Sequence, residues 1–150
     1  MKKLARSLDS AGYLGTLALR IGVGLTMAWH GWQKIDGGVT NFAGFVESLG
    51  IPAPSLMAYL VTGLELLGGI ALIAGALTRP IAALIAIEML LTGFWVKGSK
   101  LDVSFIAPEG AGIELDFVLM AGALALVFWG PGRLSVDHAA GLDRPAASPA

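Results

Sequence analysis

Residues 17–34 read LALRIGVGLTMAWHGWQK, and this stretch decides the class of fold that the chain adopts. It is close in length to a membrane-spanning helix, which needs about 20 mostly apolar residues to cross about 30 Å of hydrocarbon. Arg20 and His30 interrupt it. Because a charge at the centre of a bilayer costs ~2.5 kcal/mol or more, we expect Arg20 to face the interior of a helix bundle and to find a partner there.

The composition of the whole chain indicates a membrane protein. Of its 150 residues, 55% are hydrophobic and 14% are charged, and the mean hydropathy is +0.74, whereas soluble domains are about 25% charged. The net charge of -1, with no basic tract beyond MKK, argues neither for nucleic acid nor for an acidic lipid surface as a main partner. The hydropathy makes the lipid bilayer itself the expected partner. Since the sequence has no cysteine, redox chemistry would need a bound cofactor or a partner protein.

Four segments are predicted to span the membrane, namely residues 12–33, 56–77, 80–96 and 112–129. They predict an all-α fold, a four-helix up-down bundle in one domain over residues 1–137, followed by a flexible cytoplasmic tail over residues 138–150.

Short motifs predict how these helices are joined. The second and third helices are connected only by TRP, so they should form a tight hairpin with Pro80 in a first helical turn. Residues 41–50, NFAGFVESLG, predict a short amphipathic helix at the membrane surface, capped by Thr40 or Asn41. Residues 97–110 predict a polar loop over the mouth of the bundle, and Gly130 should end the fourth helix.

The distribution of lysine and arginine predicts the orientation. With a cytoplasmic N-terminus, the inner segments carry Lys2, Lys3, Arg6, Arg79, Arg133 and Arg144, and the outer segments carry Lys34, Lys97 and Lys100. Because basic residues concentrate on the cytoplasmic side, both termini are expected inside the cell, in a multi-pass protein of the inner (plasma) membrane. The start of the chain is assigned to the first helix rather than to a signal peptide, because Arg20 interrupts the apolar run.

Three charged residues are expected to meet at the midplane. Arg20, Glu65 and Glu88 lie about eight or nine residues from the ends of their expected helices, which is about 12–14 Å deep. The prediction is that Arg20 pairs with one or both glutamates, and that the surplus carboxylate is protonated, hydrated or balanced by a ligand. The alternative is an ion pair that only sets helix register. The nearby Gly24 and Gly31 either pack against another helix or leave room for a ligand.

A second polar group is expected at the outer end of the bundle. His30, Trp32 and Lys34 close the first helix, and Glu114 and Asp116 open the fourth. An aromatic belt is expected at the same level, made of Trp29, Trp32, Tyr59 and Trp95. Imidazole and carboxylates suit zinc, manganese or iron. No metal site is predicted, however, because one histidine without ligand spacing is more often an interfacial side chain satisfied by water.

Three stretches carry a family resemblance: LRIGVGLTMAWHGWQKI (19–35), GIPAPSLMAYLVTGLELLGGIALIAGALTR (50–79) and GPGRLSVD (130–137). Together they resemble the DoxX family of small bacterial and archaeal membrane proteins over residues 20–137. The resemblance implies a four-helix inner-membrane protein in which Arg20, Lys34 and Glu65 match family positions. It also implies a link to quinone-coupled sulfur oxidation beside a partner subunit, or to oxidative-stress complexes with superoxide dismutase and a thiol oxidoreductase.

Three functions are compatible with these residues. In the first, the chain is an oxidoreductase subunit that binds a quinone, with Arg20, Glu65 and Glu88 as the catalytic groups. The expected ligand-binding residues of that pocket are His30, Trp32, Lys34, Trp95, Glu114 and Asp116. In the second, the chain is a non-catalytic anchoring or assembly subunit of a respiratory or stress complex, or it forms a homo-oligomer. In the third, it is a small proton-coupled transporter that uses Glu65 and Glu88.

Overall fold

The computed structural model describes residues 12–143, and every regular element in this range is helical. The all-α prediction is therefore confirmed. The expectations for Lys2, Lys3, Arg6 and Arg144, and for the last residues of the tail, lie outside the described residues.

The elements follow the predicted spans closely. The first long helix is α2 (Gly12–Asp36), and a short helix, α3 (Val39–Ser48), follows it. The second long helix is continuous over Pro54–Ala74 and consists of α4 (Pro54–Gly63), the π-helical segment η1 (Leu64–Gly68) and α5 (Gly69–Ala74). The third, continuous over Thr78–Lys100, consists of α6 (Thr78–Leu90) and the π-helical segment η2 (Leu91–Lys100). The last elements are α7 (Ile113–Trp129) and α8 (Val136–Ala139).

Two local predictions are wrong. Helix α3 has Gly38 as its N-terminal cap, with no side-chain capping bond, because it begins before Thr40 and Asn41. Residues 97–100 belong to η2 rather than to a loop, and the connection to α7 is correspondingly shorter. Two others are confirmed: Pro80 lies in the first turn of α6, and α7 ends at Gly130, whose φ of 79° only glycine adopts readily.

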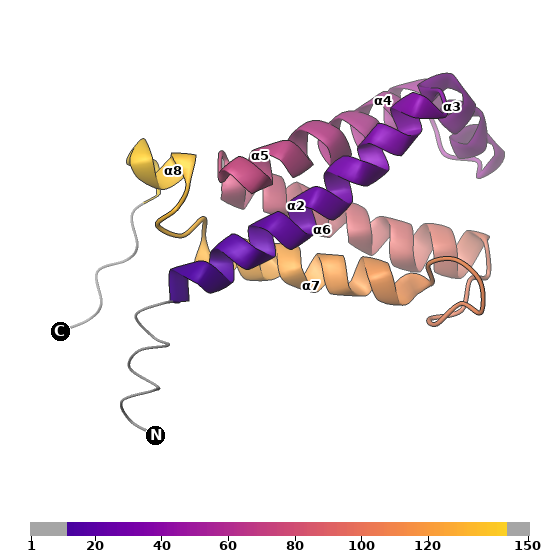
Figure 1. Cartoon of the computed structure of the whole chain (residues 1–150). Helices are drawn as coiled ribbons and strands as arrows, with labels where there is room; N and C mark the ends of the chain where they lie inside the picture. The colour runs from indigo at the N-terminus through magenta and orange to yellow at the C-terminus, as the bar shows by residue number, and fades with distance from the viewer. Residues whose placement is uncertain (1–11, 144–150) are drawn as a thin grey trace.

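The long helices pack around one apolar core (Figure 1). Helix α2 lies against η1 and α5, and α6 lies against α7. Helix α8 and the start of α2 lie at one end of the bundle, and α3 lies at the other (Figure 1). We call these the α8 end and the α3 end. The core between the helices consists of Val23, Met27, Leu72, Ala82, Ile85, Ala86, Met89, Leu119, Ala123 and Leu126.

The outer surface of the bundle is also apolar. Two helices, Pro54–Ala74 and Thr78–Lys100, are long and apolar enough to cross a membrane, with mean hydropathies of 1.9 and 1.6. Large apolar side chains on α2 and α7 are exposed as well, among them Leu25, Trp29, Val118 and Phe128. Contiguous exposed apolar surface of this kind is typical of lipid-facing helices. Spanning by α2 and by the 17 residues of α7 stays a prediction.

Candidate functional site

Arg20 lies near the α8 end of the bundle and binds backbone carbonyl groups. Its Nε donates to Leu72 O (2.9 Å) and its Nη2 donates to Ile73 O (2.8 Å). Its Nη1 donates to Pro131 O and Leu134 O, both at 2.7 Å. The side chain is almost fully buried, as predicted, but the predicted pairing with Glu65 or Glu88 is wrong.

The register between α2 and the second long helix explains this difference. A Cβ atom at Gly24 would lie 2.6 Å from Gly69 O, and one at Gly31 would overlap the backbone of Leu66. Gly31, not Arg20, therefore lies at the level of Glu65, and α2 extends past the end of α5 by about two turns. The same contacts show that the neighbouring helix occupies the space beside Gly24 and Gly31, so no room for a ligand is left there.

Lys34 is the residue that pairs with Glu65. Its Nζ lies 2.5 Å from Glu65 Oε2, and the two side chains are 18% and 7% exposed. Since α2 rises about 1.5 Å per residue, this pair lies about 21 Å from Arg20 along the bundle. The Lys34 ammonium also lies 5.0 Å from the centre of the Phe42 ring, on α3. A cation–π contact thus connects the ion pair to the amphipathic helix α3.

A second ion pair lies at the same end of the bundle. Lys97 Nζ, in η2, lies 2.6 Å from Asp116 Oδ2, in α7, and the two side chains are 21% and 6% exposed. Lys97 also donates to the carbonyls of Ala111 and Gly112, where α7 begins. Each pair thus joins a partly exposed lysine to a buried carboxylate.

A polar chamber lies between the two ion pairs. It has a volume of about 330 Å³, and its polar lining residues are His30, Lys34, Glu65, Thr92, Lys97 and Asp116. The Nδ1 atom of His30 bonds to Thr26 O at 2.8 Å, and because a carbonyl only accepts, Nδ1 carries a proton.

An apolar groove of about 380 Å³ adjoins the chamber. Helix α3 covers one side with Phe42 and Phe45, and Trp95 of η2 contributes to the lining. Three polar side chains, Lys34, Glu65 and Thr92, line both the groove and the chamber. The Lys34–Glu65 pair therefore stands on the boundary between two cavities of different chemistry.

Glu88 also lines the groove, and it is the one buried acid there that lacks a partner. Neither of its carboxyl oxygens has a hydrogen-bond partner among the described residues. The charged groups close enough to act on it are Glu65, whose carboxyl group approaches hydrogen-bonding range, Lys34 and Asp116. Glu65 pairs with Lys34 and Asp116 pairs with Lys97, so Glu88 is a third carboxyl group beside two lysines that already have partners. The prediction counted Arg20 against Glu65 and Glu88 and is wrong in its cation, because Arg20 binds carbonyls elsewhere; the carboxyl group left without a lysine is Glu88.

The remaining predicted residues lie around this region without joining it. Trp32 is exposed on α2 and lines neither cavity. Glu114 Oε1 accepts a bond from Gly112 N, at the start of its own helix. Within residues 12–143, no group of three or more acidic or histidine side chains could hold a metal ion. His30, Glu114 and Asp116 therefore do not form such a group in that range.

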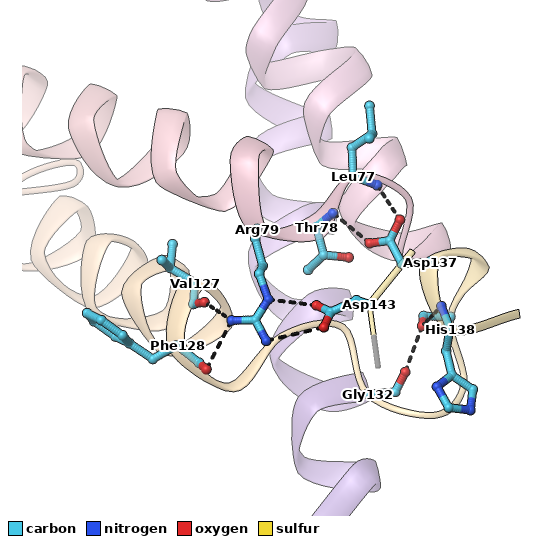
Figure 2. A network of polar contacts seen from close by, with 10 residues as sticks. Leu77, Thr78, Arg79, Val127, Phe128, Gly132, Asp137, His138 and Asp143 are labelled. Atoms are coloured by element: carbon cyan, nitrogen blue, oxygen red, sulfur yellow. Dashed lines mark hydrogen bonds and ion pairs between the residues drawn. The ribbon is translucent and has the colours of Figure 1, made fainter. Parts of the chain in front are cut away.

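The α8 end contains a polar network that sequence reasoning missed (Figure 2). Asp137 accepts bonds from the backbone N–H groups of Leu77 and Thr78, where α6 begins. Arg79 pairs with Asp143 at 2.6 Å and donates to Val127 O, at the end of α7. These contacts hold the segment after α7 against the turn that joins α5 to α6. The predicted boundary at residue 137 thus falls within α8, and Asp143 contacts the bundle.

Both cavities are bordered by the π-helical segments, which the sequence pattern did not reveal. Glu65 lies in η1, and Thr92, Trp95 and Lys97 lie in η2. A π-helical turn adds a residue to a helix and shifts the facing of the side chains beyond it, and such turns occur frequently at functional sites.

The sequence model of the DoxX family matches residues 15–98, a range that includes Lys34, Glu65, Glu88 and Lys97 but not Asp116. No solved structure matches the chain with a significant score.

Three curated proteins are similar along most of their length. A Bacillus subtilis protein named "Putative oxidoreductase CatD" is 32% identical over 126 residues, which cover 83% of this chain and 85% of that protein. The Escherichia coli inner membrane protein YqjF is 32% identical, covering 83% and 91%. The Mycobacterium tuberculosis membrane protein Rv3486 is 30% identical, covering 89% and 85%.

Proposed function

The chain belongs to the DoxX family of membrane proteins, and we propose that it is a quinone-binding subunit of a membrane redox system. The observation that carries the proposal is Glu88, a buried carboxyl group without a partner at the wall of an apolar groove. A buried polar group without a partner is costly, so it is retained where a ligand or a proton completes it. The name of the Bacillus subtilis relative, an oxidoreductase, agrees with this proposal.

The groove suits an amphiphile that enters from lipid. Its lining is mainly aliphatic and aromatic, and several of the lining side chains, including Leu60, Ile87 and Trp95, are also exposed on the outer surface. A hydrocarbon tail can therefore reach the groove without crossing water. Trp95 and Phe45 offer flat faces against which a quinone ring can stack.

The polar wall of the groove suits the quinone headgroup. A quinone carbonyl only accepts hydrogen bonds, so it needs donors. The Lys34 ammonium has three N–H donors, of which Glu65 takes one. A protonated Glu88 carboxyl group is a second donor and can pass its proton when the quinone is reduced. We assign the headgroup to Lys34 and Glu88 rather than to Arg20, whose donors are used by carbonyls.

Reduction of a quinone to a quinol takes two electrons and two protons. The chain has no cysteine, so it supplies no thiol electrons. We propose that the electrons come from a partner subunit with a flavin or an iron–sulfur cluster, while this chain binds the quinone and supplies protons.

Binding of decylubiquinone to the purified chain in lipid nanodiscs tests the proposal. Glu88→Leu removes the donor and should raise the dissociation constant about tenfold, which corresponds to about 1.4 kcal/mol. Glu88→Gln keeps a donor and should change it less than about threefold. The matched control is Glu47→Gln, because Glu47 is an exposed glutamate of α3 that lines neither cavity.

Two results would contradict the proposal. The first is that the wild-type chain does not bind decylubiquinone, and the second is that Glu88→Leu binds it as well as the wild type does. In either case the redox-site proposal fails, and a non-catalytic assembly subunit becomes the better interpretation.

A further inference from the structure

The two cavities share a wall but differ in what they can contain. Lys34, Glu65 and Thr92 line both of them. Six of the eleven residues that line the chamber are polar, against four of the eighteen that line the groove. The volume of the chamber, about 330 Å³, is well above the ~10–15 Å³ that a cavity needs to hold one water molecule. Polar and roomy cavities hold water, whereas apolar ones stay dry. The chamber is therefore suited to water and the groove to an apolar molecule.

The two lysines beside the chamber are more exposed than the carboxyl groups around them. Lys97 and Lys34 are partly exposed, with side chains 21% and 18% accessible. Their partners Asp116 and Glu65 are 6% and 7% accessible. Both carboxyl oxygens of Glu88 are buried. The lysines are thus the parts of the two pairs that solvent reaches most easily, and Glu65 stands in the wall that the chamber shares with the groove of Glu88.

The groove is a poor route for the same proton. Apart from the shared wall and Glu88 itself, its lining is almost entirely hydrocarbon, including Val46, Met57, Val61 and Leu64. A chain of hydrogen bonds needs donors and acceptors along its length, and these side chains offer none. The chamber offers His30, Lys97 and Asp116.

We propose that the polar chamber is a water-filled proton port, through which Glu88 exchanges its proton with the solvent across the Lys34–Glu65 pair. The groove admits the amphiphile and the chamber admits the protons, so the two reactants reach Glu88 from different sides. The inference rests on the proposed function only for the occupant of the groove, because proton exchange is a property of the chain alone.

Infrared spectroscopy tests the port directly. The C=O stretch of the protonated Glu88 carboxyl group is identified as the band that Glu88→Gln removes, and its shift after transfer to D₂O measures the exchange rate. Replacing the Lys97–Asp116 pair by apolar residues, in the variant Lys97→Met with Asp116→Leu, should slow this exchange at least tenfold. The matched control removes the Arg79–Asp143 pair at the α8 end, as Arg79→Met with Asp143→Leu, and should leave the rate unchanged.

The outcomes separate this inference from the proposed function. Exchange as fast as in the wild type after loss of Lys97–Asp116, or the absence of a C=O band that depends on Glu88, overturns the port. If the exchange slows but decylubiquinone does not bind, the port stands and the quinone proposal fails. Should the double variant not fold, Asp116→Asn, which keeps the shape of the side chain, gives the same test.

Discussion

The guanidinium of Arg20 satisfies carbonyl groups at the end of helix α5, where the last four carbonyls have no partner within their own helix. Leu72 and Ile73 belong to that last turn, and Pro131 and Leu134 belong to the segment after α7. A cation at a helix C-terminus is also favoured by the helix dipole. One buried side chain therefore joins α2, α5 and the C-terminal segment without a carboxylate in direct contact.

Replacement of Arg20 should weaken the bundle independently of Glu65. Arg20→Ala removes four hydrogen bonds to a charged group, and we expect a loss of about 3 kcal/mol or more in the free energy of unfolding, measured in detergent. Combining it with Glu65→Gln should give an additive loss, because distant residues do not couple. Arg133→Ala, at an exposed arginine, is the control and should be neutral. Partial rescue of Arg20→Ala by Glu65→Gln would contradict this account.

At the scale of the helices, close contacts at glycine residues determine the register between helices. The π-helical segments determine the direction in which the side chains of the site point. Gly24, Gly31 and Gly69 allow α2 to approach the second long helix so closely that a Cβ atom would overlap backbone atoms. The segment η1 then directs Glu65 toward Lys34, and η2 carries Lys97 to Asp116. The position of both ion pairs thus depends on how the helices cross.

Two glycines of the same helix should respond oppositely to alanine. Gly31→Ala would overlap the backbone of Leu66, so it should destabilise the bundle and weaken the nearby Lys34–Glu65 pair. Gly22 has open space around it, so Gly22→Ala should be neutral or stabilise by up to about 1 kcal/mol through helix propensity. Thermal unfolding in detergent compares the two. Equal stability of both variants would show that α2 does not cross at Gly31.

At the scale of the whole molecule, the structured ends of the chain lie together. The start of α2 and helix α8 are both at the α8 end, whereas α3 lies at the opposite end (Figure 1). The Lys34–Glu65 and Lys97–Asp116 pairs lie near the α3 end. This arrangement agrees with an even number of membrane passages. The proposed port and the C-terminal segment lie at opposite ends of the bundle.

Single cysteines test this topology cleanly, because the chain has none of its own. Cysteine in place of Lys3 or Ser148 should be shielded from an impermeant thiol reagent in intact cells, since both termini are predicted to be cytoplasmic. Cysteine in place of Ser99, which is exposed at the end of η2, should be labelled. Labelling at both Lys3 and Ser148 with protection at Ser99 would reverse the orientation and move the proton port to the cytoplasmic face.

The sequence by itself determined the elements of this protein. Hydropathy and helix signals depend on neighbouring residues, so the long helices, the turn before Pro80 and the stop at Gly130 were predicted within a few residues. The burial of Arg20, Glu65 and Glu88 was also predictable, because an ionised side chain on an apolar helix turns inward.

Only the tertiary structure decided which of these charges meet. Depth counted from helix ends assumes that the ends are level, whereas close glycine contacts offset α2 from α5 and bring Lys34, rather than Arg20, to Glu65. The π-helical turns that orient Glu65 and Lys97 add a residue without a change in hydropathy, so no periodicity reveals them. Pairing is a property of how two surfaces fit, and that fit depends on residues far apart in the chain.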